Sequence, residues 1–246
     1  MIEKEVAIPT ADGVSDGFLY QPAAEGRWPG VLHYTDIGGI RKSQCDMARR
    51  LAAEGYVVLV PNLLYRTAKP PVLDRALLST EELFMKRFRE LTAPLTPDAA
   101  ERDATAYVNF LASQEATAGT RMGVVGYCFA GALALRTAAV RGDKIGAAAS
   151  FHGGGLFTDK PDSPHTVLPG IKAQLYFGHA IQDRSMPQEA IEKLEAALQA
   201  WGGAYASETY EGAKHGWTVA DSPIYNQPQA ERAYKELTEL FKRALK

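Results

Sequence analysis

The sequence predicts an α/β fold with a mostly parallel central sheet of about eight strands and helices on both faces. Short apolar segments alternate with helical segments along almost the whole chain. One of them, Tyr56–Val60, is continuously apolar and largely β-branched, as expected for a strand buried on both faces of a parallel sheet. No internal repeat, low-complexity tract or linker interrupts this pattern. We therefore expect residues 1–246 to form a single domain.

The N-terminal region predicts an antiparallel edge followed by the first core strand. Lys4–Ile8 and Gly17–Gln21 alternate in polarity and are joined through Asp12-Gly13, which is typical of a hairpin. The apolar segment Pro29–Tyr34 predicts the first core strand. Lys42–Glu54 predicts a helix, which the following glycine ends.

The crossover after Tyr56–Val60 predicts two helices. Residues 79–82, Ser-Thr-Glu-Glu, are typical of a capped helix start, and this helix should extend to about Leu91. Pro94 and Pro97 interrupt the chain. The segment Asp98–Ser113 then predicts a second helix on the same crossover.

The C-terminal half continues the alternation of strands and helices. A proline in the first turn favours one of these helices. The loop after the first strand of this half is too short for a separate helical cap domain, so we expect an open cleft. The predicted elements are strands at Ile145–Phe151, Lys172–Gly178 and Ala204–Tyr210 and helices at Pro187–Trp201 and Pro228–Ala244.

Between these halves, Arg121–Gly131 predicts a buried strand, a tight turn and a helix that opens at Phe129 and runs to about Arg141. The turn matches the nucleophile elbow G-x-S-x-G, with Cys128 in the serine position and Ala130 in that of the second glycine. Small neighbours suit a strained apex, because other segments of the chain must pass close to it. The dipole of the following helix favours a thiolate.

An acid and a base follow at the carboxyl ends of two later strands, where doubly wound sheets bind ligands. Asp183 lies beyond Lys172–Gly178, and His215 lies beyond the strand that ends at Tyr210. The chain order Cys128, Asp183, His215 is that of nucleophile, acid and base in α/β-hydrolases. We expect His215 to take the thiol proton and Asp183 to orient the imidazole.

Structural roles remain open for each of these residues. Cys128 could be a small packed residue, and Asp183 could cap a helix, with Asp159 and Asp162 as alternative acids. His215 could be a turn residue, and His179 is near enough in sequence to compete with it. We assign no catalytic role to the other three histidines, His33, His152 and His165.

The oxyanion site should consist of two backbone N–H groups, those of Phe129 and Ile37. Gly38 and Gly39 would let the backbone approach the substrate, although they could equally form a simple turn. Asp36 is predicted to accept a hydrogen bond from the Cys128 thiol and so modulate it; the alternative is a solvated carboxylate.

Composition excludes several functional classes. The 246 residues carry a formal net charge of -2 without long runs of either sign, so nucleic acid and anionic membranes are poor partners. No secretory signal or membrane-spanning stretch is present, and two cysteines make no disulfide framework, so we expect a cytoplasmic location. Cys45 should be a core residue of the first helix. No metal-ligand spacing, phosphate loop or dinucleotide fingerprint occurs, so we expect no cofactor.

Four stretches resemble the dienelactone hydrolase family of α/β-hydrolases: Asp36–Gly39, Val60–Arg66, Gly126–Gly131 and Gly212–Gly216. The cysteine nucleophile is the specific part of this likeness. The resemblance implies a carboxylic ester hydrolase, of the carboxymethylenebutenolidase type, that cleaves a lactone or ester through a thioester without a cofactor. It also implies a monomeric, cytoplasmic protein. The family's acid beside the oxyanion site, usually glutamate, falls on Asp36.

The chain departs from this family at the substrate carboxylate site. Lactonases acting on chlorocatechol-derived dienelactone carry an arginine four residues beyond the base, where this chain has Val219. Cations that could replace it, or could simply be solvated, are Arg66, Lys86, Arg87 and Arg89. Aromatic residues expected to line the pocket are Tyr34, Tyr127 and Trp217. Two alternatives stay open: a general carboxylesterase with the same triad, and a non-catalytic thiol-sensing or binding protein.

Overall fold

A central sheet of eight strands, ordered β1-β2-β4-β3-β5-β6-β7-β8, organises the computed structural model, which describes residues 1–73 and 80–245. β1 and β2 form an antiparallel hairpin, β2 is antiparallel to β4, and all other neighbours are parallel. This confirms the predicted fold class. The strands are β1 (Ile2–Thr10), β2 (Gly13–Gln21), β3 (Trp28–Tyr34), β4 (Val57–Pro61), β5 (Thr117–Tyr127), β6 (Ile145–Phe151), β7 (Gln174–Ala180) and β8 (Tyr205–Tyr210).

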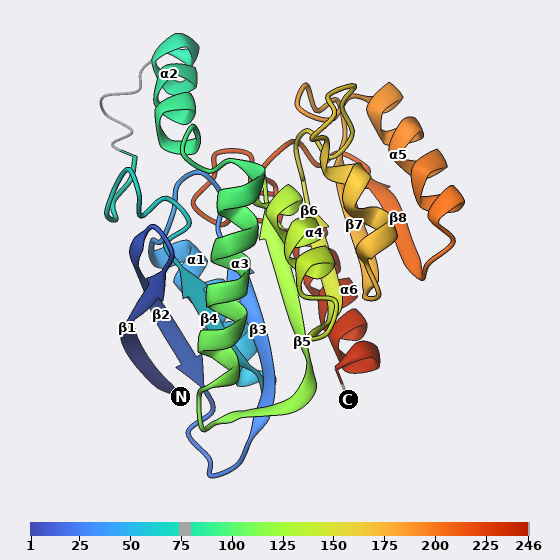
Figure 1. Cartoon of the computed structure of the whole chain (residues 1–246). Helices are drawn as coiled ribbons and strands as arrows, with labels where there is room; N and C mark the ends of the chain where they lie inside the picture. The colour runs from blue at the N-terminus through green and yellow to red at the C-terminus, as the bar shows by residue number, and fades with distance from the viewer. Residues whose placement is uncertain (74–79, 246) are drawn as a thin grey trace.

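Helices cover both faces of the sheet and create two separate core layers (Figure 1). One layer lies beneath α1 (Lys42–Ala53) and α6 (Gln227–Ala244). The other lies beneath α3 (Pro97–Ala112), α4 (Ala130–Val140) and α5 (Gln188–Trp201). The helix α2 (Glu81–Thr92) stands beyond the sheet at the edge where the parallel strands end (Figure 1).

Local sequence explains several helix boundaries. The Thr80 side chain accepts a hydrogen bond from the Leu83 N–H at the start of α2, and Asn226 caps α6 in the same way. Ser79, part of the predicted start of α2, lies outside the described residues. The predicted loop after β6 contains the short 3₁₀ helix Pro164–Gly170, and β7 begins two residues later than expected. No large cap domain is present in the described ranges.

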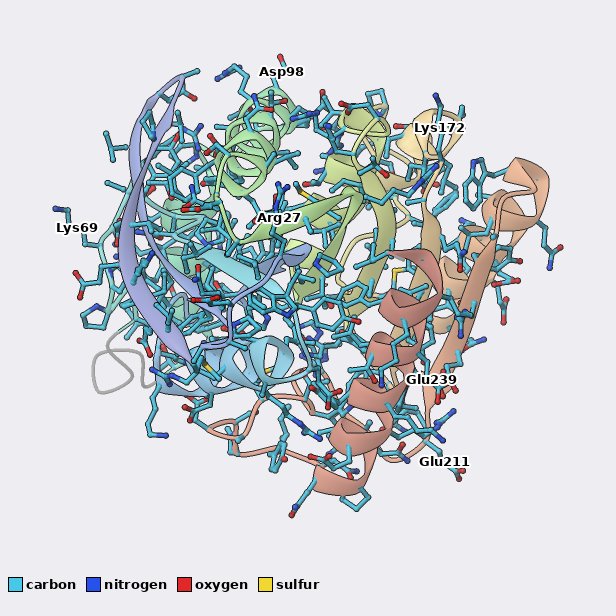
Figure 2. All side chains as sticks on the ribbon, turned by 90° about the horizontal axis from the view of Figure 1, so that it is seen from below. Arg27, Lys69, Asp98, Lys172, Glu211 and Glu239 are labelled. Atoms are coloured by element: carbon cyan, nitrogen blue, oxygen red, sulfur yellow. The ribbon has the colours of Figure 1, made fainter. Side chains whose placement is uncertain are left out.

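The surface carries charges of both signs. Seen from below, Lys69, Asp98, Lys172 and Glu211 are spread around the outline of the molecule (Figure 2). No helix in the described part of the chain is long and apolar enough to span a membrane.

The parallel arrangement brings the ends of several strands to one edge. β3 ends just before Asp36, β5 ends next to Cys128, and β7 and β8 end shortly before Asp183 and His215. Residues far apart in sequence therefore meet at this edge, as expected for a ligand site in an α/β sheet.

Candidate active site

Cys128 sits at the apex of a strained turn. Its φ angle is 59°, in the left-handed region that non-glycine residues rarely adopt. A Cβ atom on Gly126 would lie 2.0 Å from the Ala130 carbonyl oxygen, and one on Gly131 would lie 2.1 Å from Ser150 Oγ. The methyl group of Ala130 is fully buried and is accommodated by the turn. The geometry is therefore that of a nucleophile elbow.

The three predicted triad residues form a continuous hydrogen-bonded chain. His215 Nε2 lies 3.1 Å from Cys128 Sγ, and His215 Nδ1 lies 2.6 Å from Asp183 Oδ2. The Asp183 side chain is 4% exposed, whereas that of the alternative acid Asp159 is 90% exposed. The alternative histidine, His179, instead contacts Ser207. The structure thus brings together the predicted nucleophile, acid and base.

Electrostatics favour opposite charges on His215 and Asp183. Burial alone would lower the pKa of His215, but its hydrogen bonds with Asp183 and Cys128 raise that pKa to about 10. Burial would raise the pKa of Asp183, but the hydrogen bonds from His215 and Ser185 lower it. At neutral pH these shifts favour an imidazolium next to a carboxylate.

Ser185 supports the acid and was not predicted. Its backbone N–H and its hydroxyl both donate to Asp183 Oδ1, at 2.8 and 2.6 Å. The carboxylate therefore has one oxygen held by Ser185 and the other by His215. The signal in the sequence was the serine two residues after an aspartate, a spacing at which the aspartate side chain often binds the backbone.

His152, which received no role from the sequence, connects the elbow to the loop of the base. It follows β6, is 1% exposed and has a φ angle of 41°. The Cys128 N–H donates to His152 Nδ1 at 3.1 Å, and His152 Nε2 lies 2.9 Å from Thr218 Oγ1. Because Nδ1 accepts, the ring proton belongs on Nε2 and is donated to Thr218. Burial, and next the charge of His215, keep the pKa of His152 well below its usual value.

The expected oxyanion loop follows β3. In the described part of the chain, the backbone N–H groups of Ile37 and Phe129 donate no hydrogen bond to another protein group. Both amides are therefore available to a substrate oxygen. They remain the predicted oxyanion pair.

Asp36 binds an arginine in place of the thiol, which corrects the expected contact with Cys128. Arg41 donates two hydrogen bonds to it, Nη1 to Oδ1 at 2.6 Å and Nη2 to Oδ2 at 2.8 Å. The Gly38 N–H adds a third, at 2.8 Å. Two-point guanidinium–carboxylate contacts are stronger than a hydrogen bond from a thiol, so Asp36 binds Arg41 and not Cys128.

The aromatic residues predicted to line the pocket lie in the core instead, so this prediction was wrong. Tyr34 is buried against Tyr107 and bonds Thr137, and Trp217 is buried against Tyr210. Tyr127 belongs to the layer beneath α1 and α6.

The predicted cations also differ from expectation. Arg66 is not free, because it is paired with Asp12 and Asp103. Arg87 donates to the Val72 carbonyl oxygen at 3.3 Å, and Lys86 and Arg89 are exposed on α2. Val219, in the position of the family's arginine, is buried.

An aromatic wall adjoins the nucleophile. Phe129, next to Cys128, packs edge-on against Phe88 of α2, with 6.2 Å between the ring centroids. The ring centroids of Phe88 and Phe84 are 6.5 Å apart. The start of α2 also reaches the loop of the acid, because Glu81 lies 3.6 Å from Arg184. The helix α2 thus places apolar rings beside the elbow. No group of three or more potential metal ligands occurs in residues 1–73 and 80–245.

A family model and curated relatives of this chain indicate the same protein family. The Dienelactone hydrolase family matches residues 15–245. The "Putative carboxymethylenebutenolidase" of Synechocystis sp. is 27% identical, with 98% of this chain and 96% of that protein covered. The protein of the same name from Methylorubrum extorquens is also 27% identical, with coverages of 98% and 81%.

Solved structures share the fold. The crystal structure of a "Putative Dienelactone Hydrolase" from Klebsiella pneumoniae superposes with a TM-score of 0.86 at 22% identity, covering 98% of each chain. The dienelactone hydrolase-like promiscuous phosphotriesterase P91, from metagenomic libraries, superposes with a TM-score of 0.79 at 20% identity, covering 100% of each chain.

Proposed function

Because this chain belongs to the dienelactone hydrolase family, we propose that it hydrolyses a lactone or carboxylic ester through a thioester on Cys128. The observation that carries the proposal is the chain of contacts from the Cys128 sulfur through His215 to the buried Asp183. A protein that only binds ligands has no need of a nucleophile, a base and an acid aligned at three strand ends.

Acylation begins with the substrate carbonyl oxygen between the N–H groups of Ile37 and Phe129. The thiolate of Cys128 attacks the carbonyl carbon and forms a tetrahedral oxyanion, which the two amides stabilise. The imidazolium of His215 then donates its Nε2 proton to the leaving alkoxide oxygen. An alcohol departs, or the ring of a lactone opens, and the acyl group remains on sulfur.

Deacylation uses the same residues in reverse. His215, now neutral, removes a proton from water, and the hydroxide attacks the thioester carbon. The tetrahedral intermediate collapses, the sulfur leaves as a thiolate, and the carboxylic acid product is released. Asp183 holds the imidazole tautomer and stabilises the imidazolium at both stages.

The surroundings of the elbow favour an uncharged substrate. The rings of Phe84, Phe88 and Phe129 are apolar, and Val219 removes the arginine that grips a carboxylate in the lactonases. We therefore expect neutral aryl esters and lactones to react faster than dienelactone. A preference for simple neutral esters would also fit the alternative function, a general carboxylesterase with the same triad.

Turnover of phenyl acetate, dihydrocoumarin and dienelactone by the purified protein tests the proposal. Cys128→Ala should abolish turnover of all three, and mass spectrometry of Cys128→Ser or of an acid-quenched wild-type reaction should reveal an acyl adduct at this position. Cys45→Ala is the matched control, because Cys45 is the other cysteine and is buried on α1. Full turnover by Cys128→Ala would exclude the mechanism.

Iodoacetamide separates this proposal from the thiol-sensing alternative. If the protein is an enzyme, its rate of ester turnover should fall in proportion to the fraction of Cys128 that is alkylated. If it is a thiol sensor, Cys128 should be alkylated, but the untreated protein should show no ester turnover. We also expect a monomer in the cytoplasm, which size-exclusion chromatography and fractionation of cells can check.

A further inference from the structure

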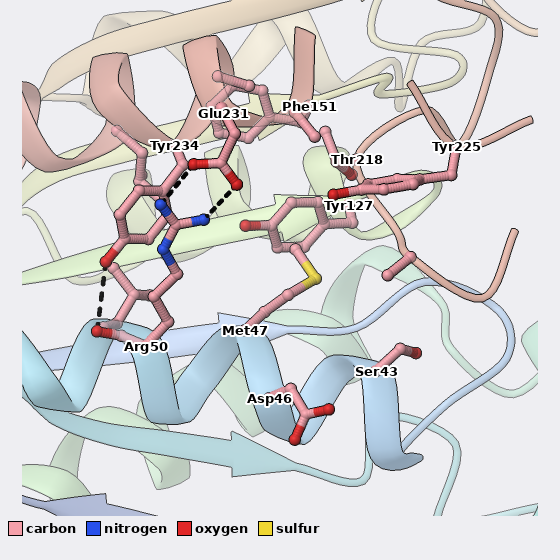
Figure 3. A pocket seen from close by; sticks show the side chains of 15 residues that line it. Ser43, Asp46, Met47, Arg50, Tyr127, Phe151, Thr218, Tyr225, Glu231 and Tyr234 are labelled. Atoms are coloured by element: carbon pink, nitrogen blue, oxygen red, sulfur yellow. Dashed lines mark hydrogen bonds and ion pairs between the residues drawn. The ribbon is translucent and has the colours of Figure 1, made fainter. Parts of the chain in front are cut away.

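A cavity lies between α1 and α6 (Figure 3), in the core layer on the other face of the sheet from α4. Its volume is about 200 Å³. Tyr127, Phe151 and Thr218 form its floor, and neither Cys128 nor His215 lines it. The remaining lining residues come mainly from the two helices and include Met47, Leu51, Ala230 and Leu237.

The charged side chains around this cavity are already neutralised. Arg50 donates to both oxygens of Glu231, at 2.7 and 2.6 Å, and stacks on Tyr234 (Figure 3). Asp46 is paired with Lys42 and Arg49. An ionic ligand would find no free countercharge among these residues, so the cavity suits a neutral molecule.

Two hydroxyl groups at the floor have a proton but no acceptor. Tyr127 is 4% exposed, points into the cavity (Figure 3), and makes no hydrogen bond in the described part of the chain. Thr218 Oγ1 receives the Nε2 proton of His152, which leaves its own proton to donate. Ser43 Oγ, which also lines the cavity, is buried and has no hydrogen-bond partner in the described part of the chain, a condition that is rare in folded proteins. This arrangement therefore points to a ligand with an acceptor oxygen.

We propose that this cavity binds a small neutral molecule with one ring and a carbonyl oxygen, which accepts the hydrogen bond of Tyr127. The ring would lie on Met47, Leu51 and Leu237. An apolar cavity of about 150 Å³ holds benzene, so the volume here admits one ring with a short substituent. The site is separate from the sulfur of Cys128 and does not depend on the hydrolase mechanism.

Titration calorimetry with acetophenone and ethylbenzene tests this site, because these probes differ mainly in the carbonyl group. The 246-residue chain is first alkylated at Cys128 with iodoacetamide, which blocks the elbow. We expect acetophenone to bind with one-to-one stoichiometry and about fivefold more tightly than ethylbenzene, as one hydrogen bond would give. Absence of acetophenone binding to the alkylated protein would overturn the proposal.

Substitutions of residues that line the cavity test whether the two probes bind there. Tyr127→Phe should remove the fivefold preference for acetophenone, and Ala230→Leu should weaken both probes by filling the cavity. Tyr234→Phe is the matched control, because its hydroxyl also borders the cavity but already donates to the Arg50 carbonyl oxygen at 3.2 Å. If Tyr127→Phe and Ala230→Leu bind both probes as the wild type does, the site is elsewhere and the proposal fails.

Discussion

Replacing Asp183 with asparagine tests how the acid controls the base. One oxygen of Asp183 accepts from Ser185 twice, so the asparagine carbonyl oxygen should keep that place. The amide NH₂ group would then face His215 Nδ1, where Asp183 Oδ2 lies at 2.6 Å in the wild type. His215 would have to accept at Nδ1 and carry its proton on Nε2. That tautomer cannot take a proton from the thiol.

The expected effects are large. Without the carboxylate, burial is opposed only by the interaction with Cys128, so the pKa of His215 should fall clearly below its wild-type value of about 10. Replacing the triad aspartate by asparagine in a serine hydrolase lowers kcat about 10⁴-fold through the wrong tautomer, and we expect a loss of this order. Because the wild-type pKa of His215 is raised, its stabilising contribution is complete below pH 6.5 and is lost as pH rises through 10. The stability difference between the two proteins should therefore narrow at alkaline pH.

Kinetics of phenyl acetate hydrolysis and an NMR titration of the His215 ring provide the measurements. Asp159→Asn is the control, because Asp159 lies on a neighbouring loop and its only described ion pair is with Lys193 at 3.9 Å. It should retain wild-type kcat. An Asp183→Asn variant within about tenfold of the wild type, or a wild-type His215 that titrates near its ordinary pKa, would refute the reasoning.

Three further substitutions probe the supports of the site. Ser185→Ala removes one of the two donors to Asp183 Oδ1; because water can replace the hydroxyl of this exposed residue, kcat/KM should fall by about threefold to tenfold, and the acidic limb of the pH profile should move to higher pH. His152→Leu removes both hydrogen bonds of a buried ring; urea denaturation should show a loss of about 1–3 kcal/mol, and kcat should fall more than KM changes. Gly126→Ala places a methyl 2.0 Å from the Ala130 carbonyl oxygen, so urea denaturation should show that the free energy of unfolding falls by about 3 kcal/mol or more, and soluble yield should fall with it.

Much of the fold and the central residues of the site could be predicted from the sequence, because their signals are local. Apolar segments and glycines mark strands and turns without reference to the rest of the chain. The rule that parallel strands end at one edge then places Cys128, Asp183 and His215 together. Their contacts at 3.1 and 2.6 Å agree with this prediction.

The misplaced residues depend on tertiary information. Tyr34 and Tyr127 lie at strand ends near the elbow, but Tyr34 is directed into the core and Tyr127 toward the space between α1 and α6. The contact between Asp36 and Arg41 depends on how the oxyanion loop joins α1, which spacing alone does not reveal. His152 was overlooked because its partners, Cys128 and Thr218, lie on other loops and meet it only in the folded chain.

The ion pairs near the oxyanion loop bear on the choice of substrate. Arg41 contacts both Asp36 and Asp221, so one guanidinium faces two carboxylates. Arg66 is likewise held by Asp12 and Asp103. Capture of a substrate carboxylate by Arg41 would require breaking a two-point contact and would bring a third negative charge to the cluster. A substrate without a carboxylate avoids both costs, which agrees with the apolar rings beside Cys128 and with valine at position 219.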